Sequence, residues 1–343
     1  MVVIVRDLCG LRIWPHRTFA GASAVTQMDS REAMKRAPGI AASIASNALY
    51  ASVVLLIVGA GSVAVGQVSV PGAFSRPAGG LPAKPGAWPQ SAWVKGHNSA
   101  VRLIGGAEPT AKDGRRLMVG VELTLAEGWK TYWRHPGDDG GLPPTFVWDR
   151  SRNLKSARVM YPAPERIKSL NGTAIGYSKS VIFPVELVPE DPNQPVEVSL
   201  ALDYGICREI CVPAEALLAL VLEPKLAAMP PDLAGHLAKV PVVMSGAAAA
   251  EVLKSAKAVL AGSQPAITFE IAADSGTTPD LFVEWPGGSY LPVPAKFGVV
   301  ARGVQRFRLD LKGVDDLSKL AGTALRLTMT GGSTATEIEW FVK

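Results

Sequence analysis

Two cysteines, Cys207 and Cys211, are separated by only three residues in the stretch DYGICREICVP, residues 203–213. The chain contains one other cysteine, Cys9. Two thiols at this spacing suit three kinds of chemistry: a structural disulfide, part of a metal site, or a couple that opens and closes by exchange with another protein's disulfide. The pair is therefore the first candidate for function.

The spacing of the pair bears on these three interpretations. A bond that closes about five residues contributes roughly 2 kcal/mol to stability, whereas a loop of about 100 residues contributes nearly 5, so this spacing favours a switchable bond. Zinc requires four ligands, and His97, His135 and His236 show no ligand spacing. Two thiolates alone suffice for Cu(I). The exchange, structural and metal interpretations all stay open at this point.

The elements that hold the cysteines have the pattern of a β-hairpin. Apolar residues alternate from 196 to 202, the period of a half-buried strand, and this places Cys207 on the face opposite the core. Residues 208–210 then form a three-residue loop, and Cys207 faces Cys211 across it. Facing residues lie about 4.5–5.5 Å apart at Cα, a separation that permits a disulfide.

Similar alternation elsewhere predicts a mainly β chain. Residues 117–125 and 181–187 alternate in the same way and are separated by turn clusters, so residues 92–224 are predicted to form an antiparallel β-sandwich. Helix formers in 225–263 predict a short helical connector. Alternation returns in 264–343, which predicts a second, smaller β domain.

The first 66 residues have the pattern of a secretory leader. Basic residues precede an apolar run that ends in small residues, and the long region before the run indicates a start at Met28 or Met34. An uncleaved membrane anchor is the alternative. Residues 67–91, rich in Pro and Gly, are predicted to be a tether. Removal of 1–66 lowers the formal charge from +5 to +2, which argues against nucleic-acid binding, and leaves one cysteine pair in an oxidising, periplasmic compartment.

Three quoted stretches resemble one known family. They are AEGWKTYWRHPGDDGGLPPTFVW, YPAPERIKSLNGTAIGYSKSVIFPVEL and DYGICREICVPAE. Over residues 92–224 they are similar to the N-terminal periplasmic domain of the thiol:disulfide interchange protein DsbD, in the variant of the ScsB-type suppressor-of-copper-sensitivity proteins. The resemblance implies an immunoglobulin-like sandwich in which Cys207 and Cys211 are the redox couple. It links the chain to copper tolerance and cytochrome c biogenesis.

The resemblance also implies partners. In the family a transmembrane thiol reductase donates electrons, and periplasmic thioredoxin-like or disulfide-isomerase-like proteins accept them. This sequence shows neither a multi-span region nor a thioredoxin-like segment after residue 225, so a separate donor is expected. The alternative is a non-catalytic binding, assembly or copper-handling module with a structural disulfide. Whether the chain is an enzyme stays open. No cofactor or resident metal is predicted, and the sequence gives no prediction of the oligomeric state.

Six further residues are candidates for partner binding. Residues 170–172 match the position of the family's aromatic cap over the cysteines, although the aromatic is missing. Trp129 and Tyr132 form an aromatic turn that either lines a docking surface or plugs the core. Tyr204 either covers the sulfurs or packs inside, and Pro213 follows Cys211 as an edge-strand proline. The candidate set is Leu170, Asn171, Trp129, Tyr132, Tyr204 and Pro213.

Overall fold

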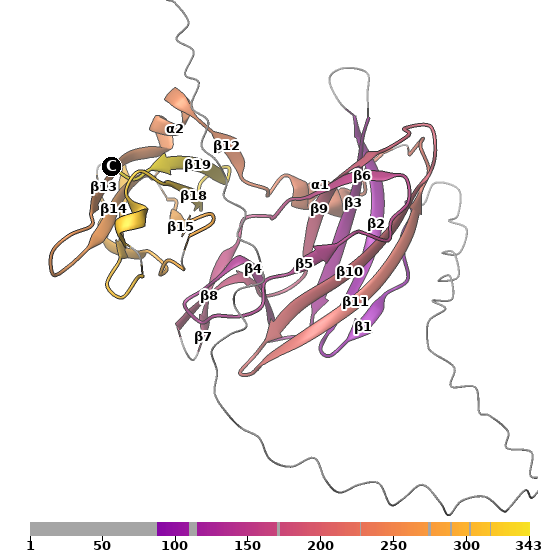
Figure 1. Cartoon of the computed structure of the whole chain (residues 1–343), viewed down its shortest axis with the longest axis horizontal. Helices are drawn as coiled ribbons and strands as arrows, with labels where there is room; N and C mark the ends of the chain where they lie inside the picture. The colour runs from indigo at the N-terminus through magenta and orange to yellow at the C-terminus, as the bar shows by residue number, and fades with distance from the viewer. Residues whose placement is uncertain are drawn as a thin grey trace, which may run out of the picture. The chain divides into compact units, whose positions relative to one another are not determined.

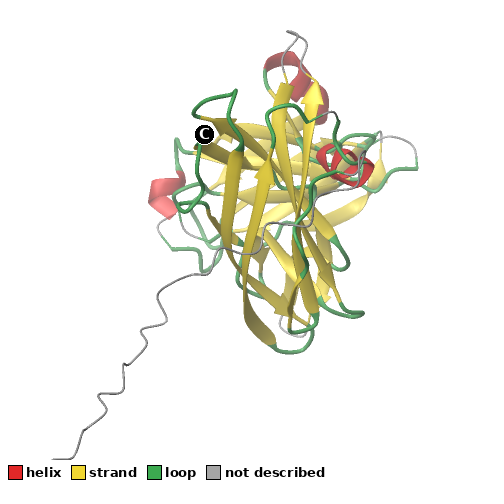
Figure 2. Cartoon of the chain, turned by 90° about the vertical axis from the view of Figure 1, so that its right-hand side faces the viewer, coloured by secondary structure: helices red, strands yellow, loops and turns green. Residues whose placement is uncertain are grey.

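The computed structural model describes residues from 88 to the C-terminus with short gaps. Strands account for most of the described chain, and the few helices are short, as Figure 2 shows. The mainly β, immunoglobulin-like fold predicted from the sequence is confirmed. The predicted leader (1–66) and nearly all of the predicted tether (67–91) lie outside the described residues, which are 88–109, 115–169, 172–226, 228–273, 276–288, 290–301, 303–315 and 317–343.

Two sheets make up the sandwich (Figure 1). The first contains, in spatial order, β1 (Val94–Gly96), β2 (Ser99–Pro109), β3 (Arg115–Leu125), β9 (Val181–Pro189) and β6 (Leu154–Val159). The second contains β11 (Cys211–Leu222), β10 (Val196–Cys207), β4 (Lys130–Gly137), β8 (Gly172–Tyr177) and β7 (Glu165–Ser169), and β5 (Thr145–Val147) pairs with β10.

The main core lies on the inner faces of these sheets. It contains the alternating residues that the sequence pattern singles out, such as Val121 of β3, Phe183 of β9 and Leu200 of β10, each at most 1% exposed. Trp133 of β4 fills the same core. Removal of this apolar surface from water supplies the main driving force for folding of the sandwich. Packing in this core also holds β10 and β4 in fixed register.

The second β domain has its own core and two four-stranded sheets. One sheet contains β12 (Val242–Met244), β19 (Thr336–Phe341), β18 (Ala324–Thr330) and β15 (Asp280–Glu284), with β12 parallel to β19. The other contains β13 (Leu253–Val259), β14 (Ala266–Ala272), β17 (Val304–Asp310) and β16 (Ala295–Ala301). A short helix, α3 (Leu317–Leu320), precedes β18.

The predicted helical connector, residues 225–263, is only partly helical. It contains α1 (Pro231–Leu237) and α2 (Gly246–Val252), but also β12 and β13. The helical prediction is wrong for 253–259, because Ala256 and Ala258 pack on the second core while β13 pairs with β14. Tertiary pairing thus overrides the helix propensity of an Ala- and Lys-rich segment. Across the described segments, no helix is both long and apolar enough to cross a membrane.

Candidate functional site: a thiol pair on a sheet rim

The two cysteines close a β-hairpin. Cys207 is the last residue of β10, Cys211 is the first of β11, and the two are register partners across a three-residue loop, as the sequence pattern predicts. Ile206 belongs to the main core, so its neighbour Cys207 faces the outer side of the sheet. Residues that face each other in a ladder share one side of the sheet, and both sulfurs are therefore on this outer side.

The sulfurs lie together but differ in accessibility. Both cysteines are free thiols, and Cys211 Sγ lies 2.8 Å from Cys207 Sγ. Cys207 is only 2% exposed, whereas Cys211 is exposed. One thiol can therefore meet another protein's sulfur, and the other lies directly behind it.

Tyr132 forms the wall of the site behind the sulfurs. Strand alternation in β4 directs Trp133 into the main core and Tyr132 to the outer face, where Tyr132 packs with Ala174 and Cys207 in a small separate cluster. The hydroxyl oxygen of Tyr132 lies 2.9 Å from Cys211 Sγ, within hydrogen-bonding distance. Tyr132 is fully buried. Tyr132 therefore contacts the thiol pair from inside the site. It does not pack in the main core of the sandwich, the other position considered for it.

A segment after β4, residues 138–142, covers this outer face; we call it the capping segment. Its Gly141 has φ +131°, and a Cβ there would lie 2.3 Å from the ring of Tyr132. The Leu142 carbonyl accepts a 2.9 Å hydrogen bond from the Gly205 amide of β10. Asp138 accepts hydrogen bonds from the amide of Val293 and the hydroxyl of Tyr290. The capping segment is thus tied down at both ends.

The cap expected at residues 170–172 can be compared with the structure at one residue only. Leu170 and Asn171 lie outside the described residues. The Cα of Gly172 comes so near the capping segment that an added Cβ would lie 3.2 Å from Asp138 Cβ. The first residue of β8 therefore adjoins the capping segment.

Two charged residues at the site were missed by the sequence analysis. Lys130 is the register partner of Cys207 on the side away from Cys211, so its side chain shares their face. Its ammonium lies 3.6 Å from Oδ2 of Asp139 and donates a 3.0 Å hydrogen bond to Ser169 Oγ. The β4 alternation could have placed Lys130, but no sequence signal brings Asp139 of the capping segment to it.

The remaining predicted site residues are placed differently. Tyr204 is 2% exposed in the main core with its hydroxyl 2.9 Å from Ser99 Oγ, so of its two interpretations the structure shows packing inside the sandwich. It continues the core-facing alternation of β10. Pro213 is exposed on the edge strand β11, two residues from Cys211 and on the same face. Trp129 is partly buried against the main core, edge-on to His97.

The environment of the sulfurs opposes negative charge. Partial burial raises the pKa of Cys211, and hydrogen bonding to Cys207 and the negative charge of Asp139 raise it further, while the hydrogen bond with Tyr132 acts in the opposite direction. Burial and the two neighbouring sulfurs also raise the pKa of Tyr132 far above its ordinary value. In the reduced protein at neutral pH, Cys211 is therefore mainly a thiol.

The raised pKa of Cys211 predicts a pH profile. Only the thiolate reacts with iodoacetamide, so the alkylation rate follows thiolate formation. An upward shift keeps Cys211 protonated to higher pH, so the midpoint of its alkylation-rate profile should lie above about pH 8.5, the midpoint of an ordinary thiol. Peptide mapping after timed alkylation at a series of pH values measures this profile; a midpoint at or below that pH would contradict the prediction.

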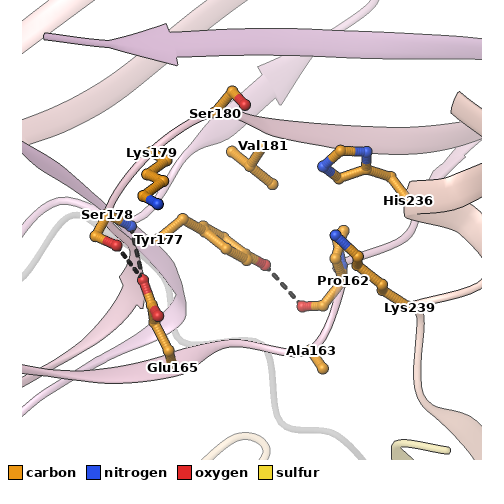
Figure 3. A pocket seen from close by; sticks show the side chains of 10 residues that line it. All are labelled: Pro162, Ala163, Glu165, Tyr177, Ser178, Lys179, Ser180, Val181, His236 and Lys239. Atoms are coloured by element: carbon orange, nitrogen blue, oxygen red, sulfur yellow. Dashed lines mark hydrogen bonds between the residues drawn. The ribbon is translucent and has the colours of Figure 1, made fainter. Parts of the chain in front are cut away.

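A concave pocket lies elsewhere on the sandwich and contains neither cysteine (Figure 3). Tyr177 extends along it and donates a 2.8 Å hydrogen bond to the carbonyl of Pro162, and His236 and Lys239 flank it. Ser178, Lys179 and Ser180 are exposed side chains of the turn between β8 and β9, and Lys239 is exposed after α1. Within the described ranges, no three His, Cys, Asp or Glu side chains gather where they could hold a metal ion.

The fold and the site are those of an immunoglobulin-like domain with two adjacent free thiols. Residues 106–223 match the family model described as "Thiol:disulfide interchange protein DsbD, N-terminal". The match covers most of the sandwich, and the second β domain lies outside it. No curated protein matches the chain.

One solved structure resembles the chain over both β domains. It is the crystal structure of the N-terminal periplasmic domain of ScsB from Proteus mirabilis, with a TM-score of 0.56 and 21% sequence identity. The likeness covers 75% of this chain and 99% of that one. At this identity the comparison shows a shared fold.

Proposed function

We propose that this chain is a periplasmic thiol:disulfide exchange protein whose Cys207–Cys211 couple carries two electrons from a membrane reductase to periplasmic partners. The observation that carries the proposal is the arrangement of the two free thiols, 2.8 Å apart, with Cys211 exposed and Cys207 buried. A purely structural bridge has no need of one accessible sulfur. The match of residues 106–223 to the interchange family adds independent support.

The exchange has two steps in this proposal. The Cys211 thiolate attacks one sulfur of a partner disulfide, forms a mixed disulfide and releases the partner's other sulfur as a thiolate. Cys207, after loss of its proton, then attacks Cys211 Sγ, forms the Cys207–Cys211 disulfide and releases the reduced partner. Two electrons pass to the partner, and its two thiolates take up the protons that the couple gives up. Donation by the membrane reductase is the same sequence in reverse.

The surroundings of Cys211 suit contact with another protein. Ile210 at the hairpin tip is 76% exposed, and Pro213 lies exposed on the other side of the thiol. Exposed apolar side chains beside a reactive group are typical of transient docking surfaces. We propose that a thioredoxin-like or disulfide-isomerase-like partner binds here, because such proteins present their own reactive sulfur at a surface.

The reduction potential of the couple tests the proposal. Residues 67–343 should be equilibrated with glutathione buffers and the fraction of free thiol measured. We expect a value between about −270 and −120 mV, the range of exchange proteins. A value below about −300 mV would mean a structural bridge, and would favour a non-catalytic binding or copper-handling module instead.

A further inference from the structure

Lys130 and Asp139 form a buried charge pair beside the couple. The side chains of Lys130 and Asp139 are only 5% and 3% exposed, and Asp139 Oδ2 is buried without a hydrogen-bond partner. Removing an ammonium and a carboxylate from water is costly, and a buried ion pair seldom repays it. The pair therefore needs an explanation other than stability.

The charge pair lies on the same face of the sheet as the two sulfurs. In the sheet, Cys207 lies between Cys211 on β11 and Lys130 on β4, and all three side chains share the outer face. Asp139 reaches the same face from the capping segment, and its charge acts on Cys211. The side chains of Lys130 and Asp139 are both buried, so solvent screens their charges less than it screens a surface pair.

Other titratable groups that face the couple are few. Tyr132 of β4 contacts Cys211 and is uncharged at neutral pH because its pKa is raised. Arg208 and Glu209 of the hairpin loop are both exposed, so solvent screens them. Lys130 and Asp139 are thus the buried charges at this site among the described residues.

We propose that Lys130 and Asp139 are positioning residues of the exchange site, a charge pair that balances proton release from the thiol couple and so sets how readily Cys211 attacks a partner disulfide. This inference rests on the proposed exchange function. In it, Asp139 restrains thiolate formation and Lys130 promotes it. The paired state holds Cys211 ready as a thiol that ionises when a partner alters its surroundings.

The two single substitutions should act in opposite directions. Asp139→Asn leaves the ammonium of Lys130 unbalanced, so the pKa of Cys211 should fall and its alkylation at pH 7 should become faster, by about tenfold for each pKa unit. Lys130→Met leaves the carboxylate unbalanced, so the pKa should rise and alkylation should slow. A favoured thiolate stabilises the reduced form, so the reduction potential should become less negative in Asp139→Asn and more negative in Lys130→Met.

The experiment uses residues 67–343 in reduced form. Alkylation of Cys211 by iodoacetamide is followed from pH 6 to pH 10 by peptide mapping, and the reduction potential is measured in glutathione buffers. The double variant Lys130→Met/Asp139→Asn removes both charges together and should return both readouts towards wild type. Asp203→Asn is the matched control: its carboxylate is exposed on β10, on the same face, and should change neither readout.

Each result decides the inference. Opposite shifts that cancel in the double variant would support it. Shifts in the same direction, or none in folded single variants, would overturn it. If both single variants fail to fold, the double variant decides, because it leaves no unpaired charge. An unchanged pH profile of Cys211 alkylation would support the proposed charge balance, and a large shift would overturn it. Failure of the exchange function would appear separately, as shifted profiles in a protein that forms no mixed disulfides.

Discussion

Cys207→Ser should capture a partner as a stable mixed disulfide, and Cys211→Ser should not. Cys211 is exposed, so it remains available for attack, while the Cys207 thiol that would release the partner is gone. In Cys211→Ser the remaining thiol is 2% exposed and cannot reach an incoming disulfide. Captured complex should be the main product in the first variant and at background in the second.

The measurement uses as the probe a thioredoxin-family protein that keeps only its reactive cysteine, activated as a mixed disulfide with thionitrobenzoate. The probe then has no second thiol that could break the captured complex. Non-reducing electrophoresis and mass spectrometry of the purified protein identify the linked peptides. The double variant, without either thiol, controls for non-covalent association. Equal capture by both single variants would contradict the division of roles between the two sulfurs. If neither variant captures the probe, the shuttle function itself is wrong.

Gly141→Ala should both destabilise the protein and uncover Cys207. Gly141 adopts φ +131°, and an added Cβ would lie 2.3 Å from the Tyr132 ring. Backbone strain and overpacking each cost about 1–3 kcal/mol, so we expect a loss of roughly 2–5 kcal/mol. Displacement of the capping segment should also speed alkylation of Cys207.

The neighbouring glycine provides a matched control for this substitution. Gly140 also has a positive φ, +70°, but an added Cβ would have no atom within 4 Å. Gly140→Ala should therefore cost only about 1 kcal/mol and leave Cys207 protected. Urea unfolding gives the free energies, and alkylation in native buffer gives the exposure. Similar behaviour of the two variants would mean that the capping segment does not shield the site.

The parts of the fold that repeat a period of two could be predicted from the sequence. Alternation in 196–202 is enough to assign the core face of β10 and so to turn Cys207 outward. The position of Cys211, four residues after Cys207, is then enough to predict a three-residue loop across which the two cysteines pair. Both predictions depend on local geometry, which a strand imposes on its own side chains.

The parts that depend on distant segments could not be predicted. The capping segment reads as a plain turn, because its role comes from the φ of Gly141 and from contact with Tyr132. Asp139 meets Lys130 only once that segment has folded back over the sheet. Likewise, β13 consists of residues that favour helices and is a strand only because β14 lies beside it.

The two sulfurs sit on strands of unequal freedom. Cys207 belongs to β10, which is paired on both sides, whereas Cys211 begins β11, the outermost strand of its sheet. Bond formation requires the sulfurs to approach from 2.8 Å to about 2.05 Å. Strand β11 has no strand paired to its outer edge, so it can make this small movement without breaking backbone hydrogen bonds there. The couple can therefore be oxidised and reduced while the core of the sandwich keeps its packing.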